Sequence, residues 1–282
     1  MSARPSPDPA PADIRAELRR ATEALAAGDG GRGRAVTSDL SIDEALLLHS
    51  IGWEPVELVC GVSLCSIPSG IWSWGQGEIA VASAAQGMAF EGAVSRIADE
   101  CTRSGGHGVV GVHVEVAVDR YHVDVELVGT AVRPVGASSG ADVFVSDLSG
   151  RDFSLLHQAG WRPVGLAYGA SFVYAPRRSA STSLKQSREN VELSNFTEAM
   201  YSARELAMER MQSTALTMGG TGIVEVKVTE GPMPFAHHAI GFAAWGTAVR
   251  LEAESHAYLR PRVVLSLDDA VVQFEAESLR SQ

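Results

Sequence analysis

The sequence predicts an α+β fold of two tandem two-layer units, each with an antiparallel sheet, a long helix and an extra N-terminal helix. The first observation is an internal repeat. The stretch SDLSIDEALLLHSIGWEPVELVCGVS at residues 38–63 recurs at residues 146–171, with 14 of 26 positions identical. Both copies also end on the same run, GTAVR, at residues 129–133 and 246–250. Between these motifs each copy shows the same order of patterns: helix, strand, long helix, strand, strand.

Each copy opens with a capped helix. Ser41 lies three residues before Glu44, which is the spacing of a capping box, and Gly52 suits the left-handed position after a helix. Ser149 and Gly160 hold the same positions in the second copy. The alternating apolar residues that follow, PVELVCGVSL and PVGLAYGASF, predict the first strand of each unit.

The long helix of each copy shows an apolar stripe at spacings of three and four residues. Asn195 and Glu198 have the residue types and the spacing of an N-terminal cap for the second helix. Both helices reach a double glycine, at residues 105–106 and 219–220, which favours a helix end. The stripes are Ala89, Ala93, Ile97 and Cys101 in the first copy, and Met200, Ala203, Ala207, Met211, Ala215 and Met218 in the second.

Two strands close each copy. In the first, GVVGVHVEVAV and YHVDVELVGTAVR predict a hairpin with Asp119 and Arg120 at its turn. In the second, GIVEVKVTE and AIGFAAWGTAVR flank a predicted loop, GPMPFAHH, at residues 231–238. Each copy is therefore predicted to be a β-α-β-β unit behind one short helix.

These patterns divide the chain into four parts. Residues 1–35 are a Pro-, Ala- and Gly-rich tail in which residues 13–27 can form one short helix. Residues 36–136 are the first repeat and residues 137–254 the second. Residues 255–282 are a C-terminal extension.

Composition limits the classes of function. The 282 residues are 45% hydrophobic and 20% charged, as in globular proteins, and the net charge of −11 disfavours nucleic acids and anionic membranes as partners. Three cysteines and the absence of a signal-peptide pattern predict a cytoplasmic protein. No apolar run has the length needed to cross a bilayer.

Two runs resemble a known bacterial family. ARELAMERMQSTALTMGGTGIVEVKV and EGAVSRIADECTRSGGHGVVGVHVEV, each followed by GTAVR, resemble the signature of the YbjQ-like family, which is labelled as heavy-metal-binding. The resemblance implies YbjQ/dodecin-like β-α-β-β units and cyclic homo-oligomers, pentameric rings in particular. This chain departs from the usual single short domain, because it is a tandem pair with an added helix before each unit. One chain can therefore fill two ring positions.

Five side chains that can bind metal ions share one side of the first-copy hairpin. They are His113, Glu115, His122, Asp124 and Glu126. In the predicted register Val118 pairs with Tyr121, and His113 lies opposite Glu126. Such a face can bind a divalent cation such as zinc, or it can be an ordinary polar face toward solvent or another subunit. The second copy lacks the set, with Lys227, Thr229, Gly241 and Ala243 at the corresponding positions.

Other candidate residues recur in both copies or stand alone in one. The recurring positions are His49, Trp53, His157 and Trp161. The two histidines suit the C-terminal end of a helix dipole, and the two tryptophans suit packing where a helix meets the sheet. Trp72 and Trp74, which have no counterpart, indicate either a ligand or partner contact or a lid within the chain.

The cysteines do not indicate a metal or catalytic site. Cys60 and Cys65 are five residues apart and so lie on opposite faces of a strand, and Cys101 falls on the buried helix stripe. No catalytic residue set or cofactor-binding motif is found. The leading hypothesis is a non-catalytic oligomeric binding or scaffold protein that associates with itself. One alternative is a metal-binding protein that uses the hairpin face. The other is a small-molecule pocket or enzyme between the repeats.

Overall fold

The computed structural model describes residues 36–68, 77–119, 121–137, 142–175, 193–233, 236–253 and 256. The chain divides into two units, Met1–Val36 and Thr37–Gln282, and both repeats lie in the second. The predicted helix at residues 13–27 and nearly all of the C-terminal extension lie outside the described residues. Within the described ranges, no helix is long and apolar enough to cross a membrane.

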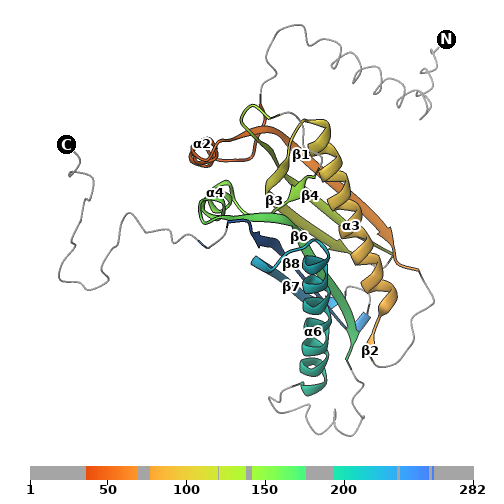
Figure 1. The fold of residues 1–282 in the computed structure, drawn as a ribbon. Helices are drawn as coiled ribbons and strands as arrows, with labels where there is room; N and C mark the ends of the chain where they lie inside the picture. The colour runs from red at the N-terminus through yellow and green to blue at the C-terminus, as the bar shows by residue number, and fades with distance from the viewer. Residues whose placement is uncertain are drawn as a thin grey trace, which may run out of the picture. The chain divides into compact units, whose positions relative to one another are not determined.

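The order of the elements confirms the α+β prediction in both repeats (Figure 1). Repeat 1 contains α2 (Ile42–Ser50), β1 (Trp53–Ser66), β2 (Gly77–Glu78), α3 (Ala80–Arg103), β3 (Gly108–Val118) and β4 (His122–Pro134). Repeat 2 contains β5 (Phe144–Val145), α4 (Gly150–Gln158), β6 (Trp161–Tyr174), α6 (Ser194–Thr217), β7 (Gly222–Met233) and β8 (Ala236–Leu251).

The predicted starts of the short helices are confirmed. Ser41 and Glu44 form a complete capping box at α2, and the Ser149 side chain accepts the Asp152 N–H at the start of α4. Gly52 follows α2 with a φ of +78°, a conformation that glycine adopts without the strain of a Cβ. The sequence motif at each repeat start therefore encodes a helix with a defined beginning and end.

The predicted cap of the second long helix is wrong. Helix α6 begins at Ser194, and Leu193 is its N-cap residue without a side-chain hydrogen bond to the helix. Asn195 and Glu198 therefore lie inside the helix. Helix α3 begins in the same way after Ile79, which also has no side-chain hydrogen bond to its helix.

Each repeat contributes one short strand to the sheet of the other. The first sheet has the strand order β1-β4-β3-β5, and the second has the order β2-β6-β8-β7. Strand β5, from repeat 2, pairs in parallel with β3, whereas β2, from repeat 1, pairs antiparallel with β6. We call these sheets sheet 1 and sheet 2. The exchange of edge strands joins the two repeats.

The predicted loop at residues 231–238 is also wrong. Strand β7 extends to Met233 and β8 begins at Ala236, so most of the segment is paired. Pro232 lies opposite Ile240 in the ladder. A proline is compatible with this position because β7 is the edge strand of sheet 2 and one side of its backbone needs no partner.

The long helices pack closely on their own sheets through the predicted stripes. Ala89, Ala93, Ile97 and Cys101 of α3 are fully buried. In α6 the buried row is Ala199, Ala203, Ala207, Met211 and Ala215, whereas Met200 and Met218 are only half-buried. Gly61 and Gly169 lie where the helix crosses the first strand, and a Cβ at either position would overlap helix backbone atoms. Glycine therefore sets the distance between helix and sheet in both repeats.

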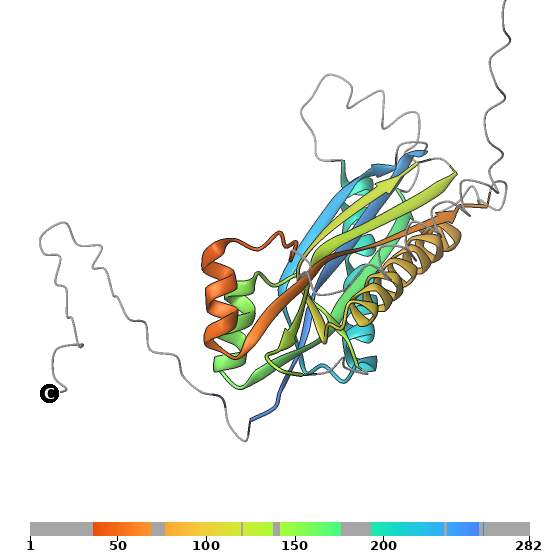
Figure 2. The same cartoon turned by 90° about the horizontal axis from the view of Figure 1, so that it is seen from above.

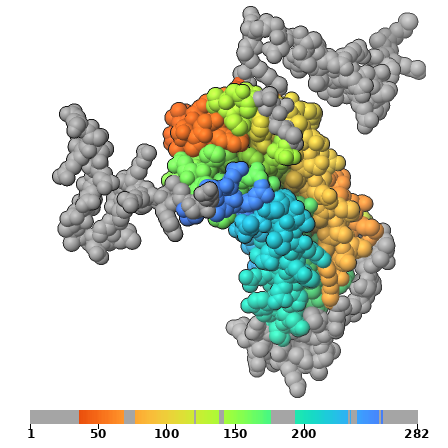
Figure 3. Space-filling model, in the orientation of Figure 1, coloured from red at the N-terminus to blue at the C-terminus, as the bar shows by residue number. Residues whose placement is uncertain are grey.

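Helix α3 buries a second face that α6 does not. Ser83 and Phe90 lie off the stripe, are 5% and 0% exposed, and contact sheet 2. The Ile79 N–H donates to the Phe172 carbonyl at 2.7 Å. The surfaces of α3 and repeat 2 adjoin in the space-filling view (Figure 3). At the other end of the interface, α2 and α4 lie side by side, and the Gly150 N–H donates to Glu44 Oε1 at 3.2 Å (Figure 2).

Candidate functional site

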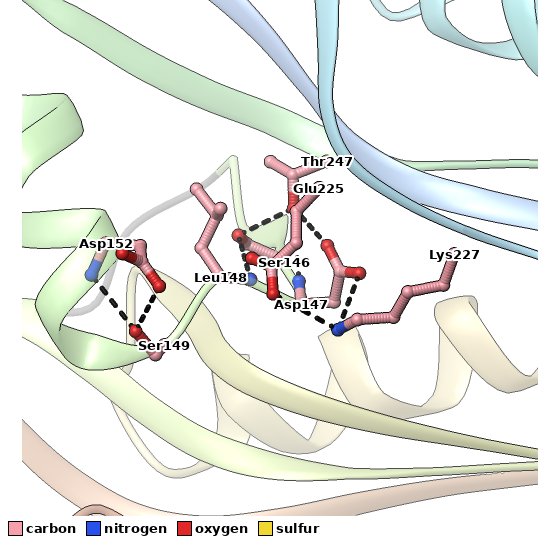
Figure 4. Close-up of polar contacts among 8 residues, drawn as sticks. All are labelled: Ser146, Asp147, Leu148, Ser149, Asp152, Glu225, Lys227 and Thr247. Atoms are coloured by element: carbon pink, nitrogen blue, oxygen red, sulfur yellow. Dashed lines mark hydrogen bonds and ion pairs between the residues drawn. The ribbon is translucent and has the colours of Figure 1, made fainter.

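The two motifs that recur in each copy contact each other. In repeat 2 the Thr247 hydroxyl donates to Asp147 Oδ1 at 2.7 Å and accepts the Asp147 N–H at 3.1 Å. Ser146 Oγ lies 2.9 Å from the same hydroxyl and accepts the Leu148 N–H at 3.2 Å. These residues converge ahead of helix α4 (Figure 4). The SDLS segment is therefore fixed onto the GTAVR strand by a threonine.

The Asp147 carboxylate is fully buried and ion-paired. Its side chain is 0% exposed, and Lys227 Nζ lies 3.3 Å from Oδ2. Glu225 lies 3.5 Å from the same ammonium group. A buried carboxylate is costly unless it is paired and hydrogen-bonded. Because Oδ1 accepts the Thr247 hydroxyl and Oδ2 faces the Lys227 ammonium group, this cluster supports a structural role rather than that of a free base.

Repeat 1 contains the same contact without the buried ion pair. Thr130 lies within hydrogen-bond distance of Ser38 Oγ, at 3.2 Å, and its hydroxyl also donates to Asp39. Asp39 is exposed, however, and His113 stands at the position of Lys227. The hydrogen-bonded connection is shared by both copies, and the lysine belongs to repeat 2 alone.

We expect Thr247→Val to destabilise the protein by about 2 kcal/mol, because it leaves a buried carboxylate and a buried N–H without their hydroxyl partner. The matched substitution Thr130→Val should cost about 1 kcal/mol, since water can replace the hydroxyl at the exposed Asp39. Urea unfolding of both variants measures the difference. Equal losses would contradict the special role of burial at Asp147.

A β-bulge follows the start of the second long strand in each repeat, β3 in the first and β7 in the second. The ladder shifts register between Val110 and His113, and again between Val224 and Lys227. The bulged residues, Gly111 and Glu225, have positive φ values of +66° and +54°. In repeat 1 the Gly111 N–H donates to the Leu148 carbonyl at 2.7 Å. The bulge of repeat 1 thus accepts a segment of repeat 2.

The predicted register of the first-copy hairpin is wrong by two residues. Val118 pairs with Val123 instead of Tyr121, and His113 lies opposite Val128. The turn begins where it was predicted but ends two residues later, because Asp119 organises it. Its N–H donates to the His122 carbonyl, and its carboxylate accepts two backbone N–H groups. These bonds, that of Tyr121 foremost, hold the pKa of Asp119 below its usual value.

The structure brings only some of the predicted metal ligands together. His113 Nε2 lies 3.4 Å from Glu115. His122 lies between Asp119, at 3.0 Å from Nδ1, and Asp124, at 3.6 Å from Nε2. Among the residues that the structure describes, no group of three or more His, Cys, Asp or Glu side chains is placed to hold a metal ion. The metal site stays a prediction.

The three cysteines lie as the sequence predicts. Cys60 is exposed and Cys65 half-buried, on opposite faces of β1, and Cys101 is buried. Burial raises the pKa of the Cys101 thiol to about 12, although the thiol donates to the Gly108 carbonyl. Cys101 is therefore a core residue that stays protonated at neutral pH.

The recurring tryptophans are half-buried, whereas the recurring histidines are exposed. His49 and His157 lie in the last turns of α2 and α4. The Trp53 ring packs edge-on against Phe153, with centroids 5.2 Å apart, and so connects repeat 1 to α4 of repeat 2. Trp161 Nε1 donates to His256 at 2.9 Å. Trp72 and Trp74 lie outside the described residues.

The side chains that join the two repeats were not predicted from the sequence. The Phe90 ring stacks on Tyr168 with centroids 5.0 Å apart and lies 6.2 Å from the Trp245 ring. A signal was available: a phenylalanine off the apolar stripe of an amphipathic helix indicates a second packed face. Because these rings pack between the repeats, the surfaces left for a partner are the outer faces of the repeats.

Comparisons with known proteins place the chain in a family. Residues 178–252 match the YbjQ_1 family model, described as "Putative heavy-metal-binding". Encapsulin nanocompartment protein Rv1762c of Mycobacterium tuberculosis is 35% identical over 247 residues, which cover 83% of this chain and 93% of that protein. The chain belongs to the YbjQ-like family. No solved structure matches it significantly. In this YbjQ-like chain the matched residues lie wholly in repeat 2, the copy without the five candidate metal ligands.

Proposed function

We propose that this YbjQ-like protein is a non-catalytic, self-associating binding or scaffold protein of the cytoplasm. The observation that carries the proposal is the uncovered outer face of β1. Leu58, Val62 and Leu64 alternate along it and are 40%, 50% and 65% exposed. A continuous row of large apolar side chains on a sheet face is a feature of protein contact sites.

The name of the Mycobacterium tuberculosis relative supports a setting for this association. That protein is named for an encapsulin nanocompartment, and it aligns with both repeats rather than with one domain. We extend this setting to the present chain and propose that it works in association with an encapsulin shell. The scaffold would then organise protein within or on the compartment.

Two experiments test these two parts separately. Light scattering of the purified full chain at micromolar concentration should give a multiple of the single-chain mass, and a clean monomer would overturn self-association. Coexpression with a tagged encapsulin shell protein from the same organism should make the chain co-sediment with assembled shells. Equal recovery with an unrelated shell of similar size would count against the encapsulin association.

Metal binding is a second candidate, supported by the family description and by the position of His122 between Asp119 and Asp124. Zinc, copper and nickel titrations of the wild type, His113→Ala and His122→Ala test it. We expect His122→Ala to weaken zinc binding more than His113→Ala does, because His122 has two carboxylate neighbours. Unchanged affinity in both variants would exclude this face.

A small-molecule pocket or an enzymatic activity between the repeats remains a third prediction. The two tryptophans expected to wall it have different neighbours: Trp53 packs on Phe144 and Phe153, and Trp161 contacts His256. No observation favours this candidate over the first two.

A further inference from the structure

Only one of the two long helices covers the sheet of the other repeat. Helix α3 of repeat 1 covers the outer face of sheet 2, where Phe90 stacks on Tyr168. Helix α6 packs on its own strands β6 and β8, and the matching outer face of sheet 1 remains exposed. Repeat 1 therefore has an unused receiving face, and repeat 2 has an unused covering helix.

Equivalent residues differ sharply in exposure on the two sheets. The repeat aligns Leu58, Val62 and Leu64 of β1 with Leu166, Ala170 and Phe172 of β6. The β1 residues are 40%, 50% and 65% exposed, whereas those of β6 are 1%, 3% and 4% exposed. The helices before them show the same difference, because Leu46 of α2 is 62% exposed and its counterpart Ser154 of α4 is 1% exposed.

Residues around α6 and β7 of repeat 2 are exposed, whereas their counterparts in repeat 1 are buried against the other repeat. Leu193, before α6, is 50% exposed, and its counterpart Ile79 is 4% exposed against sheet 2. Val226 of β7 is 42% exposed, and its counterpart Val112 is 3% exposed beside the added segment of repeat 2. The chain therefore carries a second copy of each half of the inter-repeat interface. Among the described residues, nothing covers either of these second copies.

The edge of β7 keeps the geometry that receives a segment in repeat 1. Within the described residues no strand pairs with its outer edge. The bulge persists there although Glu225, rather than a glycine, adopts the positive φ. Such a conformation is strained for a non-glycine residue and usually has a structural or functional reason. In repeat 1 the equivalent edge accepts residues 144–148; their counterparts are residues 36–40.

The charges on the two unused surfaces are complementary. Arg204 of α6 is exposed and stands at the position of Phe90 in α3. The receiving face of sheet 1 carries Glu115, Asp124 and Glu126, where repeat 2 has Thr229, Gly241 and Ala243. Within the chain Phe90 contacts the Tyr168 and Trp245 rings, and on the open face of sheet 1 the arginine at its position has carboxylates on the same side of the sheet. This gives the acidic hairpin face a role other than metal binding.

The edge of β1 repeats an arginine contact that, at β6, also involves repeat 1. At β6, Arg210 donates to the Ala170 carbonyl at 2.7 Å and forms two hydrogen bonds with Glu78 of repeat 1. At β1, Arg96 donates to the Val62 carbonyl at 3.0 Å and has no carboxylate partner among the described residues. In the sequence a glutamate, Glu192, stands two residues before α6 begins, as Glu78 does before α3.

We propose that a second copy of this chain occupies these surfaces. Helix α6 of one copy covers the outer face of sheet 1 of the next, and residues 37–40 of that next copy add to the bulged edge of β7. The proposal rests on the self-association proposed above and names its surfaces. The contact is heterologous, so every chain offers one half at each end. A closed ring built in this way contains an even number of repeats.

A pair of matched substitutions tests the interface. Leu64→Glu places a charge within the proposed contact, and Leu216→Glu places one outside it, on α6, at a residue of similar exposure, 70%. Leu216 aligns with Thr102, which is exposed, so it lies outside the proposed contact. We expect Leu64→Glu to weaken association at least tenfold in light scattering, and Leu216→Glu to match the wild type. Circular dichroism should show both variants folded.

The outcomes separate this proposal from the proposed function. A wild-type monomer would overturn self-association itself. A wild-type oligomer that Leu64→Glu leaves intact would overturn only the interface, and would assign the exposed face to another occupant such as a shell protein. If Leu64→Glu fails to fold, Leu193→Glu tests the covering helix with the same expected loss.

A charge exchange tests the orientation of the two copies. Arg204→Glu and Glu126→Arg should each weaken association, and the double variant should recover it to within about threefold of the wild type, because the pair is restored with opposite signs. A double variant as weak as the single ones would overturn the placement of α6 over sheet 1. Raising the salt concentration should weaken the wild type through screening of the same pair.

Discussion

Gly169→Ala is expected to destabilise the protein by about 3 kcal/mol. A Cβ at residue 169 would overlap the Ala207 carbonyl oxygen and lie 2.5 Å from the Met211 nitrogen. These are backbone atoms of α6, so no side-chain rotation relieves the overlap, and the whole helix must move away from β6. Urea unfolding of the purified protein, followed by circular dichroism, measures the loss.

Gly87→Ala is the control for this prediction. Gly87 lies inside α3, and a Cβ there would have no atom within 4 Å. Alanine loses less backbone freedom on folding, so this variant should gain about 0.5–1 kcal/mol. Gly61→Ala should resemble Gly169→Ala, because a Cβ at residue 61 would meet the backbone of α3 at Ala93. Wild-type stability of Gly169→Ala would show that helix and sheet are not in close contact.

Phe90→Ala should cost about 4 kcal/mol, the usual loss when a buried aromatic ring is removed. Phe90 is 0% exposed and contacts Tyr168 and Trp245 of the other repeat. The variant therefore loses both core volume and the contact between the repeats. We expect its unfolding to become less cooperative, so that tryptophan fluorescence and circular dichroism no longer report the same midpoint.

Two controls separate the role of Phe90 from general damage to α3. Phe90→Leu keeps an apolar side chain and should cost no more than about 1.5 kcal/mol. Met88→Ala removes a side chain that is 55% exposed on the same helix and should change stability by less than about 0.5 kcal/mol. If Phe90→Ala unfolds with the wild-type midpoint, the two repeats do not depend on this contact.

The helices and strands follow from local patterns. The capping box of Ser41, the positive φ of Gly52 and the alternation along β1 are properties of neighbouring residues, and each was predicted and is confirmed. Two errors have different causes. Asp119 moves the hairpin register through local bonds to backbone groups of its own turn, whereas Pro232 remains in a strand because the sheet leaves β7 at its edge.

The candidate site was predicted only in part. The five polar residues of the first-copy hairpin do share one outward side, but their pairing differs and no group of three among the described residues suits a metal. The surface around them could not be predicted, because the significance of Leu64 comes from the burial of Phe172 at the equivalent position. Sequence periodicity reports that a residue is apolar, not which of two repeats covers it.

The duplication, the β-α-β-β order and the family follow from the amino-acid sequence alone. These depend on caps, glycines and periodicity, which act over a few residues and are written twice. Only the tertiary structure decided that SDLS is held by the threonine of GTAVR, that the repeats exchange edge strands, and that α3 covers sheet 2 while sheet 1 stays open. Those contacts join residues about 100 positions apart, and local physical chemistry does not specify such pairings.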